Sequence, residues 1–163
     1  MMPTRFPELL RALSEAGVDF VVVGGAAAVA RGSVRLTQDL DVAYRRTPDN
    51  MRKLARALST HRPYLRGAPA GLPFVLDEST LRAGLNFTLV TDLGWIDLLG
   101  EVTGGGGYDE LVQHSSEMEL FGSRCRVLGL DKLIEVKRAA GRPKDLEVIA
   151  ELEAIREEME RGG

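Results

Sequence analysis

Residues 19–42 read DFVVVGGAAAVARGSVRLTQDLDV, an apolar run that ends in Gly24-Gly25 and is followed, after thirteen intervening residues, by Asp39-Leu40-Asp41. Successive side chains of a strand point to opposite faces, so Asp39 and Asp41 share a face if this stretch is extended. Such a pair of carboxylates can hold a divalent metal ion. A glycine turn that opens a helix offers free backbone N–H groups to a phosphate. Metal and phosphate binding at one sheet edge together indicate nucleotide chemistry.

The patterns around this stretch predict an α/β fold. Residues 7–16 begin with a proline, carry apolar residues at helical spacing and are followed by Gly17, which is typical of a helix. Residues 19–23 form a β-branched run, as expected of a strand that is covered on both faces. Residues 40–44 indicate the next strand, and a short helix is expected over 26–30. A helix between neighbouring strands implies layers of helices on a sheet.

The rest of the chain predicts a further helix, a hairpin and a helical end. A capped helix is expected from Thr47 to about Leu58, and residues 85–90 and 95–99 alternate as two strands of a hairpin. Residues 61–84 contain three prolines and three glycines, and no element is assigned there with firm bounds.

The C-terminal part predicts a strand and then helices. Residues 124–128 resemble a strand, and a helix follows from Asp131 until Gly141-Arg142-Pro143 interrupts it. We therefore expect a small mixed sheet flanked by helices. Its core spans residues 1–128, and a helical segment, residues 129–163, packs on the same domain.

Composition predicts a cytoplasmic globular protein. The 163 residues are 44% apolar and 28% charged, and no apolar run approaches the ~18 residues that suggest a membrane span. The N-terminus lacks the pattern of a secretory signal. The net charge of -3 argues against bulk nucleic-acid binding, although a local basic cleft for RNA stays open.

The approach to Asp39 predicts a polar face. If residues 35–41 are extended, Arg35 and Thr37 project with the two aspartates, whereas Leu36 and Leu40 face the core. Thr37 can contact a phosphate or orient Asp39. Arg35 can neutralise a triphosphate or pair with the aspartates. The competing interpretation is a solvated strand end with an arginine partner.

A third carboxylate strengthens the metal hypothesis. Asp97 lies in the apolar strand Trp95-Ile96-Asp97-Leu98-Leu99, where an ionised carboxylate is costly unless it is paired or bound to a metal. If this strand neighbours the one with Asp41, all three carboxylates can share a site. Oxygen ligands suit Mg²⁺ or Mn²⁺, and two such ions ~4 Å apart can activate an attacking oxygen and steady a leaving pyrophosphate. The alternative for Asp97 is an ion pair with a nearby arginine.

These motifs resemble the nucleotidyltransferase superfamily that includes DNA polymerase β and the minimal nucleotidyltransferases. Within it, several segments are similar to the AbiEii-like branch, which includes components of bacterial toxin–antitoxin and defence systems. The similar segments are Gly24-Gly25-Ala26-Ala27, Arg35 to Asp41, Trp95 to Leu99, Leu130 to Ile134, Lys137-Arg138 and Arg142 to Leu146. The resemblance covers nearly the whole chain.

The resemblance implies an enzyme that uses a nucleoside triphosphate, with ATP the expected donor. It implies metal-binding roles for Asp39 and Asp41 and a catalytic carboxylate role for Asp97. It also implies triphosphate contacts from Gly24-Gly25, where many members have Gly-Ser. A phosphate or acceptor site is completed if the C-terminal helices fold over the cleft, and four basic side chains are candidates for it: Lys132, Lys137, Arg142 and Lys144.

Three functions remain open on the sequence. The leading hypothesis is transfer of a nucleoside monophosphate to a hydroxyl on a small molecule, an RNA end or a protein side chain. The second is an inactive binding module that serves as an antitoxin or partner subunit. A metal-dependent phosphohydrolase ranks lowest because the chain lacks a His-Asp cluster. A protein partner or a homo-oligomer is compatible with each of them.

Overall fold

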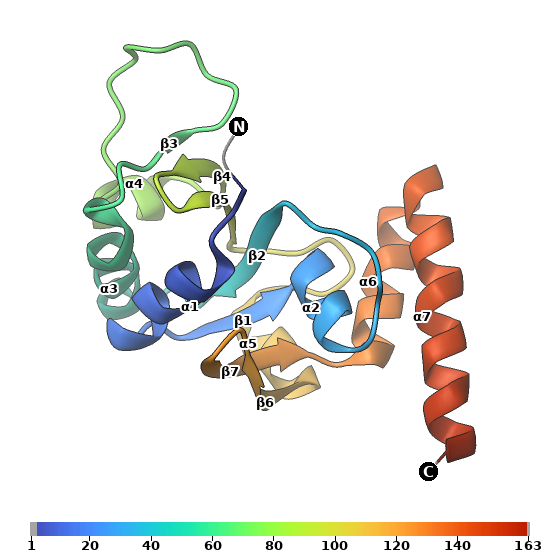
Figure 1. Cartoon of the computed structure of the whole chain (residues 1–163). Helices are drawn as coiled ribbons and strands as arrows, with labels where there is room; N and C mark the ends of the chain where they lie inside the picture. Colours follow the sequence, from blue (N-terminus) through green and yellow to red (C-terminus); the bar gives the residue numbers. More distant parts are fainter. Residues whose placement is uncertain (1–2, 163) are drawn as a thin grey trace.

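The computed structural model describes residues 3–162 and contains a mixed sheet flanked by helices, which confirms the predicted α/β class (Figure 1). Within these residues the sheet has seven strands in the order β3-β4-β5-β2-β1-β7-β6. The strands are β1 Phe20–Val23, β2 Asp39–Tyr44, β3 Tyr64–Leu65, β4 Asn86–Thr91, β5 Gly94–Leu99, β6 Ser115–Leu120 and β7 Ser123–Leu128. The helices are α1 Phe6–Glu15, α2 Gly24–Ala30, α3 Pro48–Ser59, α4 Glu78–Ala83, α5 Tyr108–Leu111, the 3-10 helix η1 Val112–His114, α6 Leu130–Ala140 and α7 Pro143–Gly162.

The centre of the sheet is formed by β5, β2 and β1. Strand β2 runs parallel to β5 and antiparallel to β1, which in turn runs parallel to β7. All four residues of β1 are buried, as are Leu40 and Val42 of β2. The continuous apolar run in β1 is therefore explained by cover on both faces, as expected.

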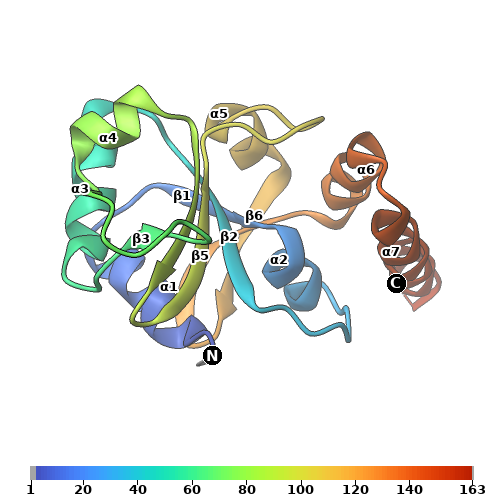
Figure 2. The same cartoon turned by 90° about the horizontal axis from the view of Figure 1, so that it is seen from above.

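Helices cover the sheet, and a pair of helices lies beyond one end of it. Helix α1 buries Leu9, Leu10 and Leu13, and it contacts α3 and β7. Helix α2 contacts β1, β2 and β7. The pair formed by α6 and α7 lies beyond α2, at the end of the molecule opposite α3 and α4 (Figure 2). Gly141, with φ of 66°, ends α6 and lets the chain turn into α7.

The predicted hairpin is confirmed as β4 and β5, and the expected strand at 124–128 is β7. One expectation about burial is wrong. Leu36 does not face the core but is 99% exposed, because residues 31–38 form a loop and the strand begins only at Asp39. The unassigned region 61–84 holds the two-residue strand β3 and α4, and the loop between them projects from the sheet (Figure 1). Among residues 3–162, no helix combines the length and hydropathy that a membrane crossing requires.

Candidate metal centre

Three carboxylates meet at the centre of the sheet. Asp41 of β2 lies directly opposite Asp97 of β5 in the parallel register, and Asp39 lies two residues before Asp41 on the same side of β2. One oxygen from each carboxylate lies within 4.8 Å of the oxygens of the other two. The expected convergence of the three side chains is confirmed. Their binding of a metal remains a prediction.

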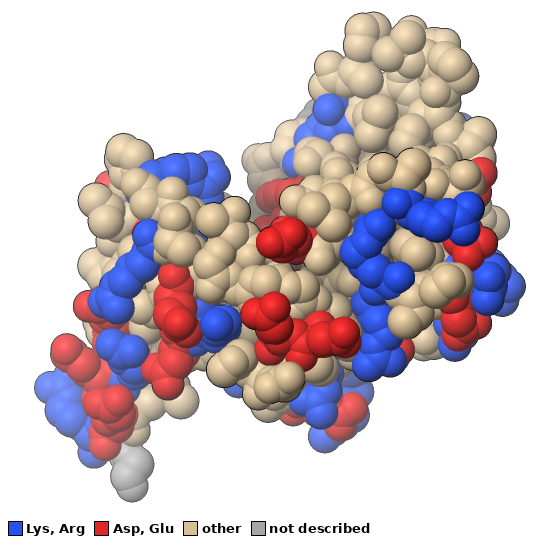
Figure 3. Space-filling model, turned by 180° about the vertical axis from the view of Figure 1, so that it is seen from behind, with Lys and Arg blue, Asp and Glu red and all other residues tan. Residues whose placement is uncertain are grey.

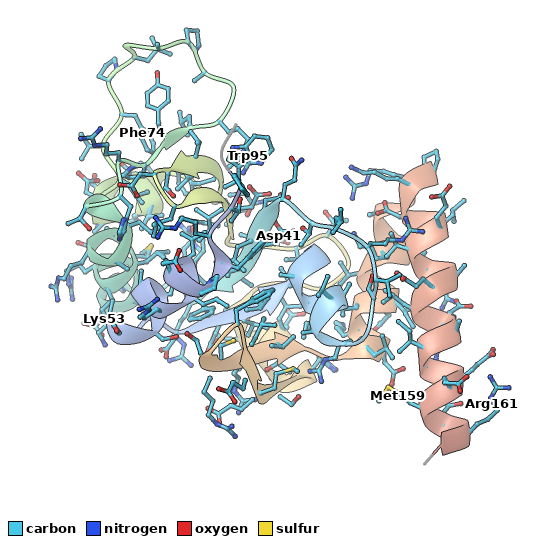
Figure 4. All side chains as sticks on the ribbon, in the orientation of Figure 1. Asp41, Lys53, Phe74, Trp95, Met159 and Arg161 are labelled. Carbon is cyan, nitrogen blue, oxygen red and sulfur yellow. The ribbon has the colours of Figure 1, made fainter. Side chains whose placement is uncertain are left out.

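Asp41 is the most buried member of this carboxylate cluster, and its backbone position is near the middle of the molecule (Figure 4). Its Oδ1 atom is inaccessible to solvent and has no hydrogen-bond partner among the described residues. Burial, followed by the charges of Asp39 and Asp97, raises the pKa of Asp41 to about 8. A solvated strand end is therefore the wrong interpretation for Asp41. An unpartnered buried oxygen beside two further carboxylates is the environment that a divalent cation relieves.

The glycine turn touches this cluster directly. Gly24 has φ of 61°, and a Cβ built on it would lie 2.0 Å from Oδ2 of Asp41. On Gly25 a Cβ would lie 2.7 Å from Oγ1 of Thr37. The hydroxyl of Thr37 donates a hydrogen bond to the backbone carbonyl of Asp39 at 3.2 Å. The two glycines thus let α2 begin in contact with the carboxylate strand and the loop that leads to it.

Arg66 also belongs to the site, although no motif in the sequence around it predicts this. Its Nη2 atom donates to Oδ1 of Asp97 at 2.5 Å, and its Nη1 atom lies 3.9 Å from Oδ2 of Asp39. The guanidinium group stacks on the ring of Trp95, 4.5 Å from the centroid. Burial raises the pKa of Asp97, and Arg66 opposes that shift. The ion-pair alternative for Asp97 is thus realised at one of its two oxygens.

A pocket of about 300 Å³ opens beside Asp41. Gly24 at the start of α2 and Asp41 of β2 line it, together with Lys137 of α6 and Arg142 between α6 and α7. Both basic residues are held by the buried Asp145, which lies 2.8 Å from Nε of Arg142 and 3.5 Å from Nζ of Lys137. The hydrogen bond from Arg142 is the main reason that the pKa of Asp145 falls to about 2. Two cations and one member of the carboxylate cluster, Asp41, therefore line one cavity.

A structural comparison relates the fold of the chain to a solved structure. The chain is similar to a protein from Thermotoga maritima described as a "putative nucleotidyltransferase", with a TM-score of 0.50 over 96% of this chain and 91% of that one. The chain therefore has a nucleotidyltransferase-like fold. The sequence identity of 14% supports the fold alone, and membership of the AbiEii-like branch remains a prediction. No model of a protein family and no curated protein matches the sequence.

Within this nucleotidyltransferase-like fold, three of the predicted ligand-binding residues lie away from the pocket beside Asp41. Arg35 is exposed and pairs with Glu151 and Glu147 of α7 at 3.5 and 3.7 Å. Lys132 pairs with Glu135 and lines a separate pocket of about 410 Å³. Lys144 is exposed on α7. Lys137 of α6 instead lines the pocket beside Asp41.

The molecular surface carries both signs of charge. Figure 3 shows the face opposite that of Figure 1, where Lys and Arg side chains form a connected run on the right, Asp and Glu gather near the middle, and both signs mix on the left. An ordered nucleic-acid track requires a continuous basic surface, because affinity comes mainly from phosphate neutralisation.

Proposed function

We propose that this protein is a Mg²⁺-dependent nucleotidyltransferase that moves a nucleoside monophosphate from a nucleoside triphosphate to a hydroxyl and releases pyrophosphate. The observation that carries the proposal is the convergence of Asp39, Asp41 and Asp97 within 4.8 Å on a nucleotidyltransferase-like fold. ATP is the expected donor. The acceptor is a hydroxyl of a small molecule, an RNA end or a protein side chain.

The residues present fit a divalent cation. Oδ1 of Asp41 is buried without a partner, and the other members of the cluster also offer carboxylate oxygens, the ligands that Mg²⁺ and Mn²⁺ prefer. Asp39 and Asp41 would hold the metal from one strand, and Asp97 would complete the set from the next. When bound, the metal would supply charge stabilisation for the reacting phosphate and for the entering and leaving oxygens.

The remaining roles belong to side chains of this chain. Lys137 and Arg142 face the pocket beside Asp41 and would bind the triphosphate, because their charges oppose those of phosphate oxygens. Asp97 would orient the acceptor hydroxyl and take its proton at a carboxylate oxygen. The backbone at Gly24 would border the phosphates, since the pocket wall there has no side chain.

Label transfer from a nucleoside triphosphate tests the proposed function. Each of the four labelled triphosphates is incubated with Mg²⁺, the protein and a cell extract, and labelled acceptors are resolved by size. We expect labelling by the wild type and a loss of at least ~10³-fold in Asp41→Asn, because the carboxylate that places the metal is removed. An Asp109→Asn variant is the control, since Asp109 is 90% exposed and lies outside the cluster.

Labelling that is equal in the wild type and Asp41→Asn would contradict the proposal. So would wild-type protein that labels nothing with any nucleotide, provided that calorimetry also detects no Mg²⁺-dependent nucleotide binding.

The position of the triphosphate is tested by two lysines of the same helix. Replacing Lys137 with Gln is expected to weaken Mg²⁺-dependent nucleotide binding ~10- to 100-fold, the range for losing a hydrogen bond to a charged group. Lys132→Gln removes the same charge from α6 but at the other pocket, and its nucleotide affinity should match the wild type. Calorimetric titration of both variants decides the assignment. Equal losses in the two variants would show that only net charge matters.

A second candidate is a nucleotidyltransferase-like binding module without catalysis, acting as an antitoxin or partner subunit. The contact between Arg66 and Asp97 favours it, because an arginine already satisfies one carboxylate of the cluster. This module would bind its protein partner with the same affinity after Asp39→Ala/Asp41→Ala substitution. The enzyme would instead lose saturable nucleotide binding in that variant.

A further inference from the structure

We infer that Arg66 is a built-in counter-cation that occupies the carboxylate cluster in the metal-free protein and must leave before a divalent metal can bind. The inference rests on the metal site proposed above and goes beyond it by coupling metal binding to the β3 edge of the sheet. It assigns Arg66 as a positioning residue, since its effect on the chemistry would pass through Asp97 and Asp39.

The contacts of Arg66 place its charge among the carboxylates. Its two terminal nitrogens face different members of the cluster, at 2.5 Å from Asp97 and 3.9 Å from Asp39. The side chain is 19% exposed, so solvent screens these contacts only weakly. A divalent ion that takes the same oxygens would lie within a few ångströms of the guanidinium group. Two cations at that separation repel each other, so the metal and Arg66 compete for Asp97.

The anchoring of Arg66 suits a side chain that can move. Besides Asp97, its Nη2 atom donates to the backbone carbonyl of Leu89 at 3.1 Å, but its Nε atom is buried without a hydrogen-bond partner, so the guanidinium group is held incompletely. It follows the two-residue strand β3, at the edge of the sheet, and precedes the loop that projects from it (Figure 1). The backbone N–H of Arg66 donates to the carbonyl of Thr88 in β4 at 3.0 Å, so its backbone stays on the sheet while the side chain moves. Departure from Asp97 therefore disturbs little of the core.

Trp95, on which the guanidinium group of Arg66 stacks, can report the displacement of Arg66 through its fluorescence. Trp95 is the only tryptophan of the chain, and the guanidinium group lies 4.5 Å from its ring centroid. Figure 4 shows Trp95 near the start of β2, on the side of the sheet toward β4. Displacement of Arg66 removes this cation–π contact. The emission of Trp95 should therefore change when Mg²⁺ binds.

Metal titration of Arg66 variants tests the competition. Mn²⁺ binding is measured by calorimetry without nucleotide, and Mg²⁺ binding is followed by Trp95 emission. We expect Arg66→Gln to bind Mn²⁺ about tenfold or more tightly than the wild type, because no cation has to be displaced. We expect its Trp95 emission to respond little to Mg²⁺, since the stacked charge is already gone. Arg66→Lys keeps the charge and should retain the weaker, wild-type-like affinity.

Two controls separate this inference from the metal site itself. Arg56→Gln removes one exposed positive charge from α3 and should leave Mn²⁺ affinity unchanged. Asp41→Asn should lose Mn²⁺ binding. Equal Mn²⁺ affinity in the wild type and Arg66→Gln would overturn the competition and leave the metal site standing. Absence of binding in every protein, Arg66→Gln included, would overturn the metal site and the competition with it.

The wild type gives a measurement that does not depend on any variant folding. Wild-type Trp95 emission that stays constant while calorimetry records saturation by Mg²⁺ would overturn the displacement of Arg66. A saturable change of emission with the calorimetric midpoint, absent from Asp41→Asn and Arg66→Gln, supports it.

Discussion

Without divalent metal, Asp41→Asn is expected to be more stable than the wild type, by a margin that grows as the pH rises from about 4 to 8. Burial and two neighbouring carboxylates raise the pKa of Asp41 to about 8, so the folded protein keeps a proton that the unfolded chain releases near its ordinary pKa of 3.8. Between these values the folded state binds more protons than the unfolded state. The free energy of unfolding of the wild type therefore falls with rising pH, by up to ~1.4 kcal/mol per pH unit.

Asparagine has nothing to release in this range, so its contribution is flat. Urea unfolding of both proteins in EDTA at several pH values measures the difference directly. Asp109→Asn, an exposed site, should parallel the wild type. The depressed pKa of Asp145, about 2, acts with the opposite sign: its stabilisation is complete above pH 4 and is lost as the pH falls through 2, outside this window. A wild type and an Asp41→Asn variant with parallel profiles would show that Asp41 is ionised and satisfied without metal.

A bound metal ion should therefore stabilise the folded protein. Mg²⁺ should raise the stability of the wild type at pH 8 by RT ln(1 + [L]/Kd), because it binds the folded state alone. The gain should vanish in Asp41→Asn. The charge of Asp41 lowers stability when no metal is bound, so we infer that its role is to bind the metal.

Much of the fold followed from local pattern. The apolar run of β1, the glycines that open α2 and the alternation of the hairpin each reflect a local requirement, and each lies where expected. The pairing of Asp41 with Asp97 needed one further assumption, that β5 lies beside β2. The register confirmed it. Side-chain alternation then places both carboxylates on one face.

The sequence predictions fail where contacts between distant segments determine the structure. The prediction that Leu36 faces the core extends the strand pattern upstream of Asp39. The chain there is a loop, so alternation of residues does not indicate which side chains are buried. Arg66 was missed because prolines and glycines obscure residues 61–84, and a two-residue strand such as β3 takes its place from pairing with β4. The pair Tyr64-Leu65 is a faint strand signal. No local sequence pattern indicates how β3 pairs with β4, and so none indicates that Arg66 lies beside the carboxylates.

Replacing Gly24 with Ala is expected to damage both stability and metal binding. Two costs combine at this position. An alanine must adopt φ of 61°, which costs ~1–2 kcal/mol, and its Cβ would overlap Oδ2 of Asp41 at 2.0 Å, adding an overpacking cost of ~1–3 kcal/mol. Asp41 cannot turn away freely because it lies in a central strand between β1 and β5. We therefore expect a loss of ~2–5 kcal/mol of unfolding free energy, measured in urea.

Gly122→Ala is the matched control, because it separates backbone strain from the clash. Gly122 has φ of 84°, and a Cβ built on it meets no heavy atom within 4 Å. Its replacement should cost only the backbone term, ~1 kcal/mol, and should leave Mn²⁺ affinity unchanged. Gly24→Ala should weaken Mn²⁺ binding at least ~10-fold, since the carboxylate it displaces is the one with the unpartnered oxygen. If the two alanine variants lose equal stability and bind Mn²⁺ alike, the contact between the glycine turn and Asp41 plays no part in forming the site.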